Sequence, residues 1–107
     1  MSSSVSCKLI MVEGPSKDQV FELTQAETVI GRAEPADILI DNLVVSRRHA
    51  RITFEGDRYT LEDLGSSNGT FINGQRLKGK VILNSGDEIG LGQHIRLTFE
   101  DPRAILT

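Results

Sequence analysis

Apolar residues recur mostly at every second position along the chain, in short runs separated by turn-forming residues. Residues 50–54 (ARITF) and 94–100 (HIRLTFE) both alternate apolar with polar side chains. A period of two is typical of strands that bury one face. No window of eleven or more residues shows a helical face. We expect about ten to eleven strands, in the segments 7–12, 19–24, 28–32, 37–40, 50–54, 58–63, 70–72, 75–77, 80–83, 88–91 and 94–100.

Strands this short and this evenly spaced predict an all-β fold, an antiparallel β-sandwich. Loops in such folds cluster at the two ends of the sandwich, and functional residues usually lie on them. We therefore predict binding loops at one end of a sandwich that covers residues 7–100. A flexible segment is expected over residues 1–6, and a tail or the start of a linker over 101–107, because Pro102 breaks the strand pattern.

The composition limits what the protein binds through bulk charge. The formal net charge of −3 disfavours nucleic acid and anionic membranes, so any anion site must be built locally. Cys7 is the one cysteine, which excludes an intrachain disulfide and a cysteine metal cluster. No run approaches the roughly 20 apolar residues of a membrane span. We expect a cytoplasmic monomer without cofactor or metal, binding neither nucleic acid nor membrane.

Three segments at strand ends carry unusual polar residues. The first, Gly31-Arg32, joins a glycine that allows close backbone approach to a planar cationic fork suited to phosphate. The second is Ser-Arg-Arg-His at 46–49. The third, GSSNGTFING at 65–74, holds two Asn-Gly pairs, each a tight-turn signal. Its Ser-Ser-Asn-Gly bend can form an anion-binding concavity. Each segment alone is also compatible with an ordinary solvated loop.

Together these segments closely resemble the forkhead-associated (FHA) domain family. The motifs are GR at 31–32, S-x-x-H at 46–49, S-N-G-T at 67–70 and N-G at 73–74, within a resemblance that runs from about residue 29 to residue 92. Members of the family are β-sandwiches that bind phosphothreonine peptides. The resemblance therefore implies a module that recognises phosphothreonine in a partner protein, and indirectly a Ser/Thr kinase that makes the mark.

The resemblance also assigns roles to individual residues. Phosphate contacts are implied for Arg32, Ser46, Arg47 and Ser67. Peptide-backbone contacts are implied for Asn68 and Asn73, the latter either supporting the loops or touching the peptide. Scaffold roles are implied for Gly31, His49 and Gly69. Two cations and two hydroxyls match the roughly −1.5 to −2 charge and three acceptor oxygens of a phosphothreonine.

An enzymatic interpretation is disfavoured by the sequence. It would combine Ser46 and His49 with an acid such as Asp63 in a hydrolase triad. No nucleophile-elbow motif is present, and nothing indicates an oxyanion hole. We therefore expect the protein not to be an enzyme.

Parts of the sequence are compatible with three other kinds of binding. The segment GLGQHI at 90–95 begins like a dinucleotide fingerprint but has Ile95 in place of the third glycine. A nucleic-acid interpretation would rely on arginines near residue 50, against a negative net charge and an aromatic content of 5%. The serious competitor is a phosphate-independent interaction module on the same fold, and the intact residues Arg32, Ser46, Arg47 and Asn68 argue against it.

Overall fold

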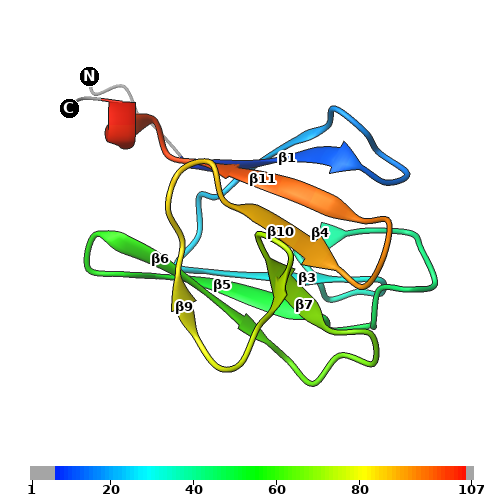
Figure 1. The fold of residues 1–107 in the computed structure, drawn as a ribbon. Helices are drawn as coiled ribbons and strands as arrows, with labels where there is room; N and C mark the ends of the chain where they lie inside the picture. Colours follow the sequence, from blue (N-terminus) through cyan, green and yellow to red (C-terminus); the bar gives the residue numbers. More distant parts are fainter. Residues whose placement is uncertain (1–6, 106–107) are drawn as a thin grey trace.

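Two β-sheets pack face to face in the computed structural model, which describes residues 7–105 (Figure 1). The first sheet has the order β2-β1-β11-β10-β7-β8, from the strands β1 (Lys8–Glu13), β2 (Val20–Glu22), β7 (Thr70–Ile72), β8 (Gln75–Arg76), β10 (Glu88–Leu91) and β11 (Arg96–Glu100). The second has the order β4-β3-β5-β6-β9, from β3 (Glu27–Gly31), β4 (Ile38–Leu39), β5 (Ala50–Glu55), β6 (Arg58–Asp63) and β9 (Val81–Ile82). The predicted β-sandwich is confirmed. The segment 1–6, expected to be flexible, lies outside the described residues.

One strand pair departs from the antiparallel pattern. Strands β3 and β4 pair in parallel, with Ile30 opposite Ile38 and Gly31 opposite Leu39. The loop 32–37 turns the chain back along the sheet edge, so that the chain runs a second time in the direction of β3. As a result, the segments that follow β3 and β4 leave the sheet at the same end.

The core lies between the sheets and is built from alternate residues of the strands. Leu97 and Phe99 of β11 are buried, as is Ile52 of β5, in agreement with the alternation seen in the sequence. Phe54, on the same face of β5, departs from this pattern and is 36% exposed. It lies beside the hairpin turn and packs against Tyr59, with the rings tilted and their centroids 4.7 Å apart. The buried strands form a rigid platform for the loops.

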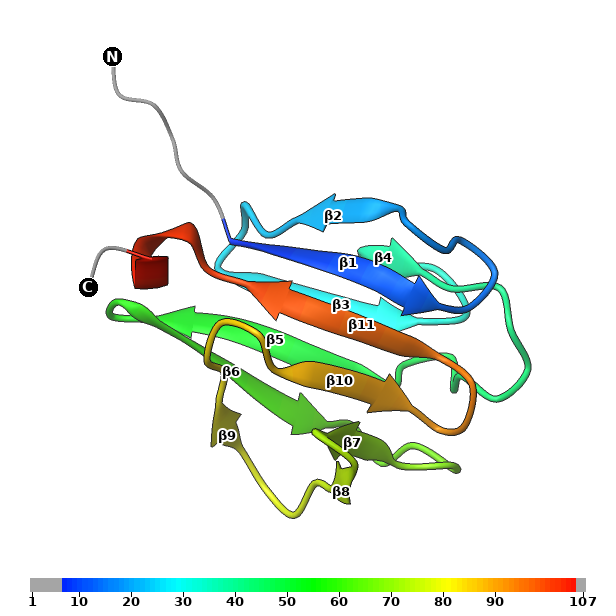
Figure 2. The ribbon, with the colours of Figure 1, turned by 45° about the horizontal axis from the view of Figure 1, so that its top comes forward.

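The loops that follow β3, β4, β6 and β10 lie together at one end of the sandwich (Figures 1 and 2). We call this the loop end. The β5–β6 turn lies at the opposite end, where the described chain also begins and ends (Figure 2). The loop end therefore gathers the three unusual segments of the sequence. Within residues 7–105, no helix has the length and hydropathy to cross a membrane.

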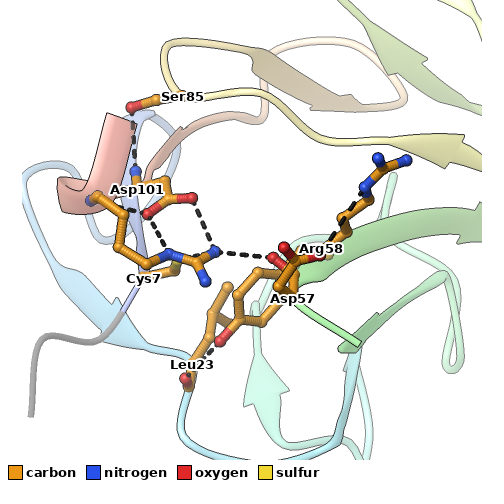
Figure 3. Close-up of polar contacts among 8 residues, drawn as sticks. Cys7, Leu23, Asp57, Arg58, Ser85 and Asp101 are labelled. Atoms are coloured by element: carbon orange, nitrogen blue, oxygen red, sulfur yellow. Dashed lines mark hydrogen bonds and ion pairs between the residues drawn. The ribbon is translucent and has the colours of Figure 1, made fainter. Parts of the chain in front are cut away.

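At the opposite end, the C-terminal segment contacts the β5–β6 turn (Figure 3). A short 3₁₀ turn (Pro102–Ile105) follows β11, and the Arg103 guanidinium donates to both oxygens of the Asp101 carboxylate at 2.9 Å. These hydrogen bonds hold the pKa of Asp101 below its usual value. Arg103 also donates to the carbonyl oxygen of Asp57 at 3.2 Å. The first residues of the expected tail are thus fastened to the β5–β6 turn.

Candidate functional site

Gly31, the last residue of β3, allows the 46–49 loop to lie directly on the strand end. A Cβ atom at this position would come within 1.9 Å of the Arg47 carbonyl oxygen, which is backbone and has no rotamer to escape into. Two backbone hydrogen bonds hold the contact: Arg32 N–H donates to Ser46 O at 3.0 Å, and His49 N–H donates to Ile30 O at 2.8 Å. The Gly-Arg motif therefore begins with a residue that no side chain can replace in this geometry.

Arg32 is held beside the 46–49 loop by its own side chain. Its Nε–H donates to the carbonyl oxygen of Val45 at 2.9 Å, and the side chain is half-buried. The two terminal nitrogens of the guanidinium make no hydrogen bond or ion pair with any residue in the described range 7–105. One donor thus fixes the orientation, and the terminal N–H groups stay available for an anion.

His49 is fully buried and joins two loops. Its Nδ1 accepts a hydrogen bond from Ser46 N–H at 3.0 Å, and its Nε2 lies 2.8 Å from the carbonyl oxygen of Gly69. A backbone N–H can only donate and a carbonyl can only accept, so Nε2 carries the proton and the ring is neutral. Burial lowers the pKa of His49 and keeps it in this form. The imidazole thereby links the 46–49 loop to the 64–69 loop.

The same two loops meet through their polar residues. Ser67 N–H donates to Ser46 Oγ at 3.0 Å, and the Asn68 side-chain nitrogen donates to the carbonyl oxygen of Val44 at 2.8 Å. Ser46 Oγ acts as an acceptor here, which leaves its own proton free to be donated. The segments that follow β3 and β6 therefore both contact residues 44–46, which belong to the segment that follows β4.

Asp63, at the end of β6, organises the loop that carries Ser67 and Asn68. Its carboxylate accepts hydrogen bonds from the backbone N–H groups of Gly65 and Ser66, both at 2.9 Å, and from the hydroxyls of Ser66 and Thr70. Burial opposes ionisation of this carboxyl, but the hydrogen bonds outweigh that effect and hold its pKa below the usual value. A charged Asp63 therefore fixes the start of the loop.

Comparison with known proteins identifies the family. The model of the FHA domain matches residues 28–92, the stretch that contains Gly31-Arg32, the 46–49 loop and the 64–69 loop. The chain belongs to the FHA domain family. Members of this family act as phosphothreonine-dependent protein-interaction modules.

Relatives at moderate identity include longer regulatory proteins. The oxoglutarate dehydrogenase inhibitor of Corynebacterium jeikeium is 42% identical over 94 residues, 88% of this chain and 64% of that protein. The glycogen accumulation regulator GarA of Mycolicibacterium smegmatis is 40% identical over 96 residues, 90% of this chain and 60% of that protein. This FHA domain thus spans less than two thirds of the length of either relative.

A solved structure shares the fold at the level of the whole domain. EmbR of Mycobacterium tuberculosis, in complex with a low affinity phosphopeptide, superposes on this chain with a TM-score of 0.83 and 35% identity. The match covers 91% of this chain and 24% of that one. The FHA domain described here therefore corresponds to one part of a larger protein in that case.

The structure brings most of the predicted site residues of this FHA domain to one place. Arg32, Ser46, Ser67 and Asn68 meet at residues 44–46, and Arg47 is exposed in the same loop. The predicted scaffold residues lie beneath them. These are Gly31, His49 and Gly69.

Asn73 lies apart from this group, in the β7–β8 turn. With φ values of 50° for Asn73 and 86° for Gly74, the pair forms the two-residue turn that the sequence predicted. The Asn73 side chain donates to Asp87 Oδ1 at 3.0 Å and accepts from Glu88 N–H at 2.9 Å. Its amide is occupied in joining the turn to β10. These contacts favour the loop-supporting role of Asn73 over a contact with the peptide.

The contacts of Ser46, His49 and Asp63 do not form a hydrolase triad. Both ring nitrogens of His49 are taken by backbone groups, so the imidazole is not placed to deprotonate the Ser46 hydroxyl. The Asp63 carboxylate binds its own loop. The pattern Asp-x-Gly-Ser at residues 63–66, at the end of a strand, is a sequence signal for such hydrogen bonds. It could have identified Asp63 as the residue that organises this loop.

Substitution of Gly31 tests the close contact with the 46–49 loop. We expect Gly31→Ala to lower the free energy of unfolding by about 2–3 kcal/mol, because the backbone must move to admit the methyl group. Gly90→Ala is the matched control in another strand, where the nearest atoms to an added Cβ are 3.4 Å away. Its expected cost is about 1 kcal/mol or less. Urea denaturation measures both, and equal losses would contradict the close-contact account.

The neutral state of buried His49 predicts a pH dependence. An unfolded histidine takes up a proton near pH 6.5, whereas the folded pKa lies lower, so the unfolded state binds more protons as the pH falls below about 6.5. Stability should therefore fall between pH 7 and 5, by at most about 1.4 kcal/mol per pH unit from this group. Above that window the effect is absent.

The His49→Gln variant isolates this contribution. Urea denaturation at pH 7, 6 and 5 should show a smaller loss of stability with falling pH in His49→Gln than in the wild type. The same comparison in a His94→Gln background keeps the contact of the other imidazole with Glu13 out of the measurement. The account is wrong if His49→Gln and the wild type show the same slope.

Proposed function

We propose that this FHA domain binds a phosphothreonine side chain of a partner protein at the loop end, with Arg32, Ser46, Arg47 and Ser67 donating to the phosphate. The convergence of three loops on residues 44–46 carries the proposal. It leaves the terminal N–H groups of Arg32 and the hydroxyl proton of Ser46 without a partner among the residues described. The two residues belong to segments that are distant in sequence and joined by hydrogen bonds.

The charge distribution supports an anion as the ligand. Arg32 and Arg47 have no carboxylate within 4.0 Å in the described range, although acidic residues outnumber basic ones in the chain by 15 to 12. Hydrogen bonds to charged groups contribute roughly 1.5–3 kcal/mol each. Two or three of them supply the affinity of a micromolar-class site, about 8 kcal/mol, together with contacts to the peptide.

Asn68 is suited to hold the backbone of the peptide. Its side-chain nitrogen is occupied by Val44 O, so the amide cannot rotate freely, and its side-chain oxygen remains an acceptor. That oxygen can receive an N–H group from the peptide next to the phosphothreonine. The carbonyl of Val44 thus orients Asn68 in the way that the carbonyl of Val45 orients Arg32.

The chemistry of phosphothreonine indicates the biological setting. A phosphothreonine is made by a Ser/Thr kinase, so the partner is a kinase substrate, and we place the interaction in the cytoplasm with this protein as a monomer. The names of the relatives, a regulator of glycogen accumulation and an inhibitor of oxoglutarate dehydrogenase, support a regulatory role. Control of a metabolic protein through such binding is the role that we propose.

Peptide titrations test this function. A degenerate peptide pool with one fixed phosphothreonine should bind the wild type, and the unphosphorylated pool should bind at least about tenfold more weakly, as expected for the loss of one or more charge-assisted hydrogen bonds. Arg32→Ala and Ser46→Ala should each weaken binding by about ten- to a hundredfold for the same reason. Arg48→Ala is the matched control, an exposed arginine in the same loop without a proposed phosphate contact, and should cost less than about threefold.

Each outcome of the titration has a separate meaning. Equal binding of phosphorylated and unphosphorylated pools would contradict the proposal and favour a phosphate-independent module. A phosphoserine pool should bind somewhat more weakly, because burial of one methyl group contributes about 0.8 kcal/mol. Thermal unfolding of each variant shows whether a lost interaction reflects a lost fold.

A further inference from the structure

Arg76 is a second cation beside the proposed phosphate site, and no motif of the sequence drew attention to it. It is the last residue of β8 and pairs with Phe71 of β7, next to the end of the 64–69 loop. Its side chain is exposed and makes no ion pair with any residue in the described part of the chain. Arg76 therefore carries a charge that the folded chain leaves unneutralised.

The exposed guanidinium of Arg76 lies against Gly69. A Cβ atom built on Gly69 would come within 2.9 Å of Arg76 Cζ and 3.1 Å of Nη2. Gly69 also has a φ of +88°, a conformation that favours glycine. The absence of a side chain at position 69 thus provides the space in which the guanidinium lies. Gly69 directly follows Asn68, so the guanidinium lies next to the proposed peptide-binding residue.

A depression in the surface connects Arg76 with the proposed peptide-binding residue. It is lined by Val44, Asn68, Phe71, Arg76 and Gln93. Its lining contains one cation and no carboxylate. A peptide bound to Asn68 would therefore have its neighbouring residues beside a guanidinium and an aromatic ring.

The acidic residues of the neighbouring strands already have partners of their own. Asp63 accepts hydrogen bonds from its own loop, Asp87 binds Asn73 and the N–H of Asn84, and Glu88 pairs with Arg96 at 3.3 Å. None of them pairs with Arg76. An incoming carboxylate would therefore meet a cation without first having to break an existing ion pair.

We propose that Arg76 is a specificity-determining residue that selects phosphothreonine partners with an aspartate or glutamate close to the phosphothreonine. The inference rests on the proposed function, because the contact of Asn68 with the peptide is what brings flanking residues into the depression. An extended peptide advances about 3.3 Å per residue. Since Arg76 lines the same depression as Asn68, we expect the acidic residue within about four positions of the phosphothreonine. The planar guanidinium then binds the carboxylate through paired hydrogen bonds.

A peptide series with a single variable residue tests this inference. Each peptide has one phosphothreonine in a Gly/Ala/Ser background and carries Glu, Gln or Lys at one of the four positions on either side. The wild type should bind the Glu peptide about three- to tenfold more tightly than the Gln peptide at one or two of these positions, the range between an exposed and a partly desolvated ion pair. The measured quantity is the ratio of the two dissociation constants within one protein, so a general loss of affinity cancels.

Variants of Arg76 should remove or reverse this preference, depending on the charge that they introduce. Arg76→Gln should bring the Glu/Gln ratio close to one at the selective position, and Arg76→Glu should reverse the preference in favour of the Lys peptide. The matched control is Arg58→Gln, which removes an exposed arginine from the β5–β6 hairpin at the opposite end and should keep the wild-type ratio.

The outcomes separate this inference from the function on which it rests. A wild type without a Glu preference at any position, or an Arg76→Gln protein with an unchanged ratio, would overturn the role of Arg76 and leave phosphothreonine binding intact. Failure of every phosphorylated peptide to bind better than its unphosphorylated counterpart would overturn both. A Glu preference that disappears only in the Arg76 variants supports the proposal.

Discussion

The candidate site depends on the buried imidazole of His49. One ring nitrogen holds the backbone of the 46–49 loop and the other holds Gly69, twenty residues further along the chain. These hydrogen bonds are shielded from water because the side chain is fully buried, so they are stronger than exposed ones would be. The contacts between Ser46 and Ser67 and between Val44 and Asn68 lie at the surface and require the spacing that the imidazole sets.

The arginines of the chain fall into two groups with different surroundings. One group has a carboxylate partner: Arg51, Arg58, Arg96 and Arg103. Arg51 and Arg96 join neighbouring strands, Arg103 holds the C-terminal segment, and Arg58 pairs with the adjacent Asp57. Those without one, within residues 7–105, lie at or beside the loop end: Arg32, Arg47, Arg48 and Arg76. A site for an anion needs cations of the second kind, because a cation already paired must lose its partner before it can bind. A chain of net charge −3 can therefore present a local positive surface.

The strands and the Asn73-Gly74 turn could be predicted because alternation and positive φ are local properties that single residues reveal. The parallel pairing of β3 and β4 could not, since it depends on the path of the loop 32–37. The motif residues of the site were found through their resemblance to a family. Arg76 was not, because only the pairing of β7 with β8 and the space above Gly69 bring it to the site.

Backbone amide signals in a ¹H–¹⁵N correlation spectrum, recorded during titration with a phosphothreonine peptide, test the central claim most directly. The account predicts that the signals of Arg32, Ser46, Ser67 and Asn68 shift with the phosphorylated peptide and not with its unphosphorylated twin, while those of the β5–β6 turn stay in place. Shifts confined to other surfaces, or identical shifts with both peptides, would contradict a phosphothreonine site at the loop end.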